Sequence, residues 1–217
     1  MESHSSDKKN HTINPDDGHA LPVMEMFMTL QGEGYHKGKA AFFIRIGGCD
    51  VGCHWCDVKE SWNAELHPLM RVEEIITEVK KHHPLETVVI TGGEPLMWNL
   101  HELTTALKQL SLQVHLETSG SWPLSGVFDW ICLSPKKTGM VCPEILSKAD
   151  ELKIIVYNQH DFQWAEQWAD RVKKGCRLYL QPEWSRRNIM LPYIIRYIQS
   201  HPRWTLSLQT HKYIGIP

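Results

Sequence analysis

The chain has 217 residues, of which 42% are hydrophobic and 22% charged, and its formal net charge is -2. This composition predicts one globular unit, and the near-neutral charge excludes the basic excess typical of nucleic-acid-binding domains. No apolar run reaches the roughly 18 to 20 residues that span a bilayer, and no apolar segment near the N-terminus resembles a signal peptide. We therefore expect a cytoplasmic protein with no membrane or nucleic-acid partner.

Residues 1–20 are polar and aperiodic, which predicts a disordered leader before a single domain at 21–217. Beyond the leader, short β-branched or aromatic runs alternate with amphipathic segments. Strands are predicted at 24–30, 41–46, 87–91, 113–117, 130–133, 152–156, 177–180 and 205–208. Apolar residues at helical spacing predict core-facing helices around 72–79, 100–110, 162–172 and 191–198.

Such alternation predicts parallel strands joined by crossover helices. The units are too few for a closed eight-stranded barrel, so we expect an α/β fold: an open, partial βα barrel with a mostly parallel sheet. Unusual sequences directly follow six of the predicted strands: GGCDVGCHWCD, GGEP, TSG, SPK, QPEW and QTHK. Because active sites of parallel βα folds assemble at the C-terminal ends of strands, these six segments are expected to form one site.

Three of the six cysteines lie in one predicted loop, Cys49-x3-Cys53-x2-Cys56. The other three are scattered along the sequence, and we expect them to be buried structural residues. Three thiolates can hold a [4Fe-4S] cluster and leave one iron open to chelate S-adenosylmethionine. The alternative is structural zinc in an interaction module without catalysis. Zinc normally takes four ligands, often from two Cys-x2-Cys pairs, so His54 or a distant cysteine would have to complete the site.

The cysteine spacing, with Trp55 before the last cysteine, resembles the signature of the radical S-adenosylmethionine superfamily. The segment TGGEP at 91–95 resembles the superfamily's second motif, which contacts the amino group of the cosubstrate. Glycines suit this role because they let the backbone approach a ligand closely. The segment follows a predicted strand, which strengthens the resemblance.

Further segments resemble the 7-carboxy-7-deazaguanine synthase family: TLQGEG at 29–34, FIRIGGC at 43–49, ETSG at 117–120, SPK at 134–136 and LQTHKYIGIP at 208–217. The resemblance implies a lyase that converts 6-carboxy-5,6,7,8-tetrahydropterin to 7-carboxy-7-deazaguanine with loss of ammonia, on the way to queuosine or another 7-deazapurine. It also implies a homodimer and an electron donor such as flavodoxin or ferredoxin. The nearest alternative is a radical activating enzyme that generates a glycyl radical on a partner protein, because it shares the QGEG stretch.

The resemblance also implies roles for individual residues. Arg45 and Glu117 are expected to be catalytic, with Arg45 pairing with the substrate carboxylate because a guanidinium donates two parallel hydrogen bonds. The other expected substrate-binding residues are Leu30, Gln31, Gly32, Thr91 and Pro217, the last through a terminus that folds back over the pterin. S-adenosylmethionine is expected to bind Trp55, Gly93, Ser134, Pro135, Lys136, Gln181, Pro182, Glu183 and Trp184.

Val58 departs from the family pattern, which generally has Thr or Ser directly after Cys-Asp to help bind magnesium. Valine offers no oxygen to a hard cation. Either magnesium binds through substrate, water and another carboxylate, with Asp57 as a candidate, or the protein works without it. We expect Mg²⁺ as a third cofactor.

Overall fold

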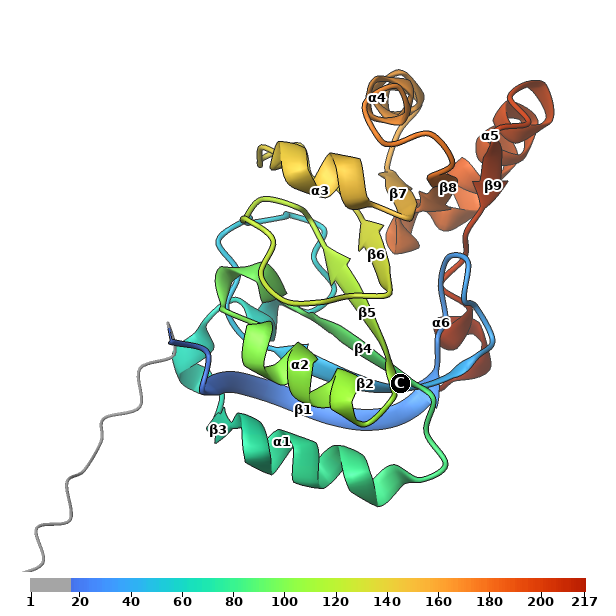
Figure 1. Ribbon diagram of the computed structural model, residues 1–217. Helices are drawn as coiled ribbons and strands as arrows, with labels where there is room; N and C mark the ends of the chain where they lie inside the picture. The colour runs from blue at the N-terminus through green and yellow to red at the C-terminus, as the bar shows by residue number, and fades with distance from the viewer. Residues whose placement is uncertain (1–16) are drawn as a thin grey trace, which may run out of the picture.

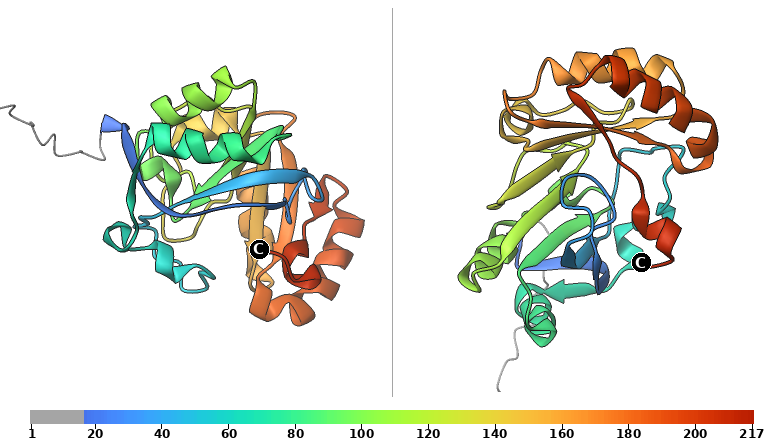
Figure 2. Two further views of the ribbon diagram at one scale, coloured as in Figure 1. Left: turned by 90° about the horizontal axis from the view of Figure 1, so that it is seen from below. Right: turned by 90° about the vertical axis from the view of Figure 1, so that its right-hand side faces the viewer.

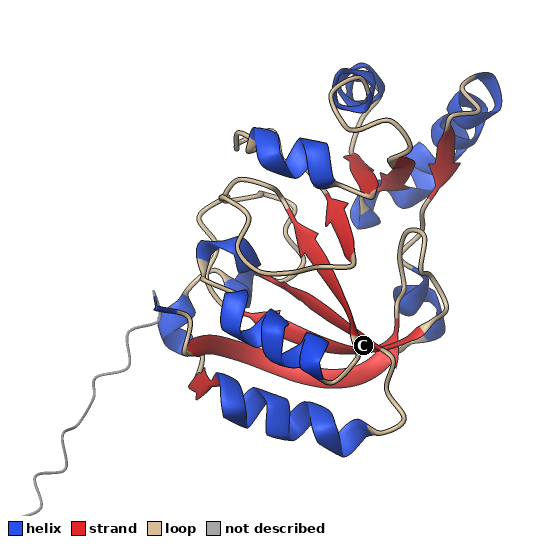
Figure 3. Cartoon of the chain, viewed as in Figure 1, coloured by secondary structure: helices blue, strands red, loops and turns tan. Residues whose placement is uncertain are grey.

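The computed structural model describes residues 17–217, and within them a nine-stranded sheet runs in the order β3-β1-β2-β4-β5-β6-β7-β8-β9 (Figure 1). From β2 to β9 each neighbouring pair is parallel, whereas β1 is antiparallel to β2 and β3. The sheet does not close, because β3 and β9 are its two edges (Figure 3). The predicted open α/β barrel is thereby confirmed. The strands are β1 (Ala20–Leu30), β2 (Ala40–Ile46), β3 (Leu69–Arg71), β4 (Thr87–Gly92), β5 (Gln113–Thr118), β6 (Trp130–Leu133), β7 (Glu151–Val156), β8 (Arg177–Pro182) and β9 (Trp204–Leu206).

Five helices cover the outer face of the curved sheet, and the short C-terminal helix lies on the inner side near the loop that follows β2 (Figures 1 and 2). On the outer face, apolar residues of α1 and α2 such as Ile75 and Leu103 are fully buried. No helix within residues 17–217 is long and apolar enough to cross a membrane. The helices are α1 (Val72–Val79), α2 (His101–Gln109), α3 (Pro143–Lys148), α4 (His160–Ala169), α5 (Arg187–Ser200) and α6 (Thr210–Ile214).

Side-chain alternation along the strands separates the core from the inner face of the sheet. In β7, Leu152 and Ile154 join the hydrophobic core, so the strand period of two turns Lys153 to the opposite face. Likewise, Ile44 in β2 is 0% exposed in the core, whereas Arg45 beside it is only partly buried and faces inward. The inner face therefore carries charged side chains, and it is the face on which a site can form.

Several elements differ from the sequence predictions. Ala20, placed in the predicted leader, begins β1 and is 0% exposed, while residues 1–16 lie outside the described range. β3 was not predicted, because three residues are too few to show a strand period; it pairs with Ala20–Pro22 at the start of β1. The helices α3 and α6 were missed for the same reason of length. The division into leader and single domain stays a prediction.

Candidate active site

A cavity of about 500 Å³ opens on the inner face, and segments that follow β1, β2, β4, β5, β6, β8 and β9 all contribute to its wall. The predicted site residues that line it are Leu30, Gln31, Gly32, Arg45, Cys49, Cys53, Trp55, Cys56, Thr91, Gly93, Glu117, Ser134, Lys136, Gln181, Pro182, Glu183, Trp184 and Pro217. Pro135 is buried beside two of them and is not part of the lining. The structure thus brings residues from almost the whole described chain to one concave surface.

The cysteine loop and the GGEP loop are held against each other by backbone contacts. Gly93 N donates to Ile46 O at 2.9 Å, and Glu94 N donates to Gly48 O at 2.8 Å. A side chain at Gly93 would place its Cβ 2.2 Å from Gly48 O and 2.9 Å from Cys49 Cβ, so only glycine permits this approach. The two motifs therefore form one continuous wall of the cavity.

All three loop cysteines line this wall as free thiols. Burial raises the pKa of the Cys49 and Cys53 thiols, as expected for sulfur atoms that are partly withdrawn from water. Among the described residues, no three His, Cys, Asp or Glu side chains converge on the position of one metal ion. A cluster needs one thiolate per iron rather than several around one ion, so this donor set fits a cluster better than tetrahedral zinc.

Glu94 anchors the GGEP loop from beneath. Its carboxylate is only 1% exposed and accepts hydrogen bonds from Thr118 Oγ1 at 2.6 Å, from the Ser119 backbone N–H at 2.8 Å and from the Ser119 hydroxyl. A buried carboxylate is stable when its lone pairs are filled in this way. The contacts join the ends of β4 and β5, so Glu94 has a positioning role that the motif alone did not reveal.

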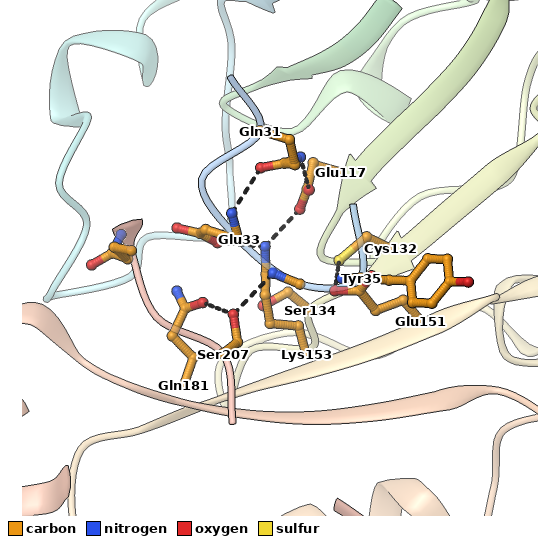
Figure 4. A network of polar contacts seen from close by, with 12 residues as sticks. Gln31, Glu33, Tyr35, Glu117, Cys132, Ser134, Glu151, Lys153, Gln181 and Ser207 are labelled. Atoms are coloured by element: carbon orange, nitrogen blue, oxygen red, sulfur yellow. Dashed lines mark hydrogen bonds and ion pairs between the residues drawn. The ribbon is translucent and has the colours of Figure 1, made fainter. Parts of the chain in front are cut away.

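The cavity floor carries a buried charge cluster (Figure 4). Lys153 Nζ lies 2.6 Å from Glu33 Oε2 and 2.8 Å from Glu117 Oε2, and Gln31 Nε2 donates to Glu117 Oε1 at 3.2 Å. Burial alone would raise the pKa of Glu33, but the Lys153 ammonium and hydrogen bonds from Gln181 and Gln209 together lower it to about 2. Sequence reasoning missed Lys153 and Glu33. A lysine in the middle of the apolar strand ELKIIV was the available signal, because unpaired lysines are rarely buried.

Arg45 also lines the cavity, from β2. It is paired in register with Thr91 of β4, and its Nε donates to Glu25 Oε1 at 2.6 Å. The Arg45 side chain is 20% exposed. Because Nε is used by Glu25, the terminal guanidinium nitrogens are the donors left for a ligand in the cavity.

The C-terminal segment borders the cavity mouth. Pro217 O accepts a hydrogen bond from Thr29 Oγ1 at 3.1 Å, and Lys212 Nζ lies 2.5 Å from Asp57 Oδ2. Gln209 Nε2 donates to the same oxygen of Asp57 at 3.3 Å. These contacts tie the last residues to both β1 and the cysteine loop. Lys212, Gln209 and His211 line the cavity as well; the sequence placed their segment at the site but gave none of them an individual role.

The wall formed after β6 and β8 is polar. Lys136 Nζ donates to Ser134 O at 2.8 Å and to Ser134 Oγ at 2.7 Å, and burial lowers its pKa. Gln181 Oε1 accepts from Ser207 Oγ at 2.6 Å. Glu183 accepts from the backbone N–H of Ser185 at 3.0 Å. These internal bonds fix the turns that present Trp184 and Lys136 to the cavity.

Comparison with known proteins gives a consistent match. The family model described as the radical SAM superfamily matches residues 43–137. The 7-carboxy-7-deazaguanine synthase of Flavobacterium psychrophilum is 54% identical over 209 residues, which cover 96% of this chain and 99% of that protein. That of Synechocystis sp. is 50% identical over 197 residues, which cover 91% of this chain and 94% of that protein.

Among solved structures, the crystal structure of QueE from Escherichia coli superposes with a TM-score of 0.82 and 29% identity, covering 91% of this chain and 97% of that one. The similarity therefore extends over most of the chain. With relatives this similar over this length, the chain belongs to the 7-carboxy-7-deazaguanine synthase family of the radical SAM superfamily.

Proposed function

We propose that the chain converts 6-carboxy-5,6,7,8-tetrahydropterin to 7-carboxy-7-deazaguanine with release of ammonia, in the formation of queuosine or another 7-deazapurine. The observation that carries the proposal is one cavity lined by two unlike sets of groups. The first set is the three cysteine thiols, and the second is Arg45, Glu117 and Gln31, which offer a cation and acceptors to an ionic heterocycle. Such a cavity can hold a radical source and a small polar substrate side by side.

The radical SAM family uses a [4Fe-4S] cluster and S-adenosylmethionine, and in this chain Cys49, Cys53 and Cys56 would hold the cluster. When bound, the cluster and S-adenosylmethionine supply the radical that takes a hydrogen atom from the substrate. The protein contributes orientation and exclusion of water.

We assign the cosubstrate to the wall between the cysteine loop and the end of β8. The Gly93 backbone would contact the amino acid end of S-adenosylmethionine, because a residue without a Cβ lets the main chain approach the ligand closely. The turn after β6 would bind through Ser134 and Lys136, whereas Pro135 would act by fixing the shape of that turn. The other residues assigned to the cosubstrate are Trp55, Gln181, Pro182, Glu183 and Trp184.

The substrate is assigned to the opposite side. The terminal nitrogens of Arg45 would pair with its carboxylate, and Glu117 would accept hydrogen bonds from ring N–H groups. The further contacts would come from Leu30, Gln31, Gly32, Thr91 and Pro217.

Magnesium is part of the proposal, with Asp57 as its candidate protein ligand because Val58 lacks an oxygen. Lys212 and Gln209 both donate to Asp57 Oδ2, and among residues 17–217 no side chain donates to Oδ1. An ion would bind through Oδ1, substrate and water. If turnover were the same with a chelator as with Mg²⁺, magnesium would be removed from the proposal.

We further propose a cytoplasmic homodimer reduced by flavodoxin or ferredoxin. All six cysteines are free thiols, which suits a reducing compartment. The outer edge of β1 is paired by β3 only at Ala20–Pro22, and Met28 farther along the strand is 40% exposed. An open edge of this kind can accept a second copy of the chain. Native mass spectrometry of the reconstituted protein would give the number of subunits.

The test of the proposed function is turnover by anaerobically reconstituted protein with S-adenosylmethionine, a reductant and 6-carboxy-tetrahydropterin, with and without Mg²⁺, followed by mass spectrometry. We expect 7-carboxy-7-deazaguanine. Cleavage of S-adenosylmethionine with the pterin left intact would discard the assigned substrate and favour a radical activating enzyme.

A further inference from the structure

Lys153 is the most deeply buried cation in the cavity, and the roles assigned above do not use it. It comes from β7, whereas its partners come from the loop after β1 (Glu33) and from β5 (Glu117). The Lys153 side chain is 6% exposed, and those of Glu33 and Glu117 are 16% and 21% exposed. One ammonium group therefore joins three segments that are distant in the sequence.

The two carboxylates have the same cationic partner. Both place an oxygen within hydrogen-bonding distance of the same nitrogen, at 2.6 and 2.8 Å. Two carboxylates held against one nitrogen repel each other when the cation is removed, so a variant without Lys153 should take up one proton on the pair. With Lys153 present, burial raises the Glu33 pKa, but Lys153, together with Gln181 and Gln209, lowers it by more. The Lys153 pKa lies well above its usual value because the surrounding acidic groups outweigh its burial.

Two further contacts orient the acceptors. Gln31 donates to Glu117 Oε1 at 3.2 Å, and its own Oε1 accepts from the Glu33 backbone N–H at 3.1 Å (Figure 4). The cluster formed by Glu33, Glu117 and Lys153 has one more negative than positive charge. Its free lone pairs suit a ligand that presents several N–H donors and no acceptor at that point.

We propose that Lys153 is a positioning residue that keeps Glu33 and Glu117 ionised as a pair of acceptors for the N–H edge of the aminopyrimidinone ring of the substrate. The inference rests on the proposed function and extends it, because it names the part of the ligand that this floor recognises. Lys153 acts through the two carboxylates, and the ligand contacts them rather than Lys153.

The test is the pH dependence of product binding. Isothermal titration calorimetry would measure the affinity of the reconstituted protein for 7-carboxy-7-deazaguanine between pH 6 and 9, under anaerobic conditions. The ligand's own ionisation affects every variant equally, so the informative quantity is the ratio of each variant's Kd to that of the wild type. Other ionisable groups also face these residues: Glu151, Cys132, Lys136, His36, His211, Lys212 and Asp57. Because Glu151, Cys132, Lys136 and His211 interact with Lys153, any effect of their shifts on the ratio would appear equally in K153M/E33Q, which loses the same charge.

For Lys153→Met we expect binding at least tenfold weaker at the acidic end, with the Kd ratio falling by up to about tenfold per pH unit as the shared proton is released. Lys153→Arg keeps the charge, so its ratio should not change with pH. The double variant K153M/E33Q leaves one carboxylate, so it should bind weakly and also without pH dependence of the ratio. Lys108→Met, which removes another paired lysine far from the cavity, should match the wild type.

A Lys153→Met ratio that is constant with pH, or affinity equal to the wild type, would overturn the inference. If Lys153→Met does not fold, K153M/E33Q must fold, because it no longer leaves two carboxylates without a cation. If neither variant folds, the role of Glu33, Glu117 and Lys153 is purely structural, and the inference is overturned. If the wild-type protein forms no product in the turnover assay, the proposed function is wrong, whatever the binding data show. The two failures are therefore distinguishable.

Discussion

Lys212 Nζ lies 2.5 Å from Asp57 Oδ2, so the last helix of the chain is joined to the residue that follows the third cysteine of the cluster loop. The pair is partly open to water, with 22% of the Lys212 side chain and 54% of the Asp57 side chain exposed. Pairs of this kind add at most about 1 kcal/mol to global stability. Its importance is local, because it holds α6 at the cavity mouth.

The first prediction concerns this pair. Lys212→Met should raise the KM for the pterin about two- to tenfold and change kcat less, because it loosens the segment that ends at Pro217. Steady-state kinetics with fixed S-adenosylmethionine would measure it. Lys148→Met, which removes an exposed pair with Glu144 on α3, is the control and should change neither constant. An unchanged KM in Lys212→Met would show that α6 stays in place without it.

The second prediction concerns the cluster. Alanine at Cys49, Cys53 or Cys56 should each abolish cluster binding and turnover, since two remaining thiolates cannot hold three irons. Iron content and visible absorbance after reconstitution would show this. Cys176→Ala is the matched control, because burial raises the pKa of that thiol to about 12 and it lies outside the cavity. A fully active single variant among the first three would contradict the cluster assignment.

The third prediction concerns Arg45. Its replacement by alanine should raise the substrate KM by about 10- to 100-fold with the cluster intact, the usual loss for a charge-assisted hydrogen bond. Glu25→Gln removes the charge of the group that accepts from Nε and leaves the terminal nitrogens, so it should have a much smaller effect. Equal kinetics for Arg45→Ala and the wild type would remove Arg45 from the carboxylate role.

The fourth prediction concerns Glu94. Glu94→Gln keeps the shape but offers N–H donors where Thr118 and Ser119 already donate, so it should reduce the free energy of unfolding by about 1–3 kcal/mol. Urea unfolding of the cluster-free protein would measure the loss. Stability equal to the wild type would mean that the loop does not depend on this anchor.

The fifth prediction concerns pH. Burial lowers the pKa of His115 to about 4, and its ring lies 4.4 Å from that of His36 and 6.4 Å from that of Trp130. The unfolded chain therefore binds a proton at higher pH than the folded one, so this group destabilises the fold as pH falls from about 6.5 to 4. Stability measured by urea unfolding should show a weaker acid dependence in His115→Phe. If the free energy of unfolding depends on pH equally in both proteins, a group other than His115 causes the acid dependence.

The sequence predicts strands and site residues best where a short segment carries both a regular hydrophobic pattern and chemically distinctive side chains. Strand runs such as that of β4 and the loop cysteines could be located because each leaves a signal within a few residues. Lys153 could not be assigned, because its role depends on Glu33 and Glu117, which are 120 and 36 residues away along the chain. The same limit applies to Lys212 and Asp57, which are 155 residues apart. Pairings of this kind depend on sheet order, which periodicity does not encode.

The contact between Thr29 and Pro217 joins positions 188 residues apart, one near the end of β1 and the other in the segment that follows α6. Closing so long a loop is entropically costly until the intervening strands are in place. The substrate side of the cavity should therefore be among the last parts of the molecule to form during folding. It should also be among the first to open by fraying, while the sheet beneath it remains intact.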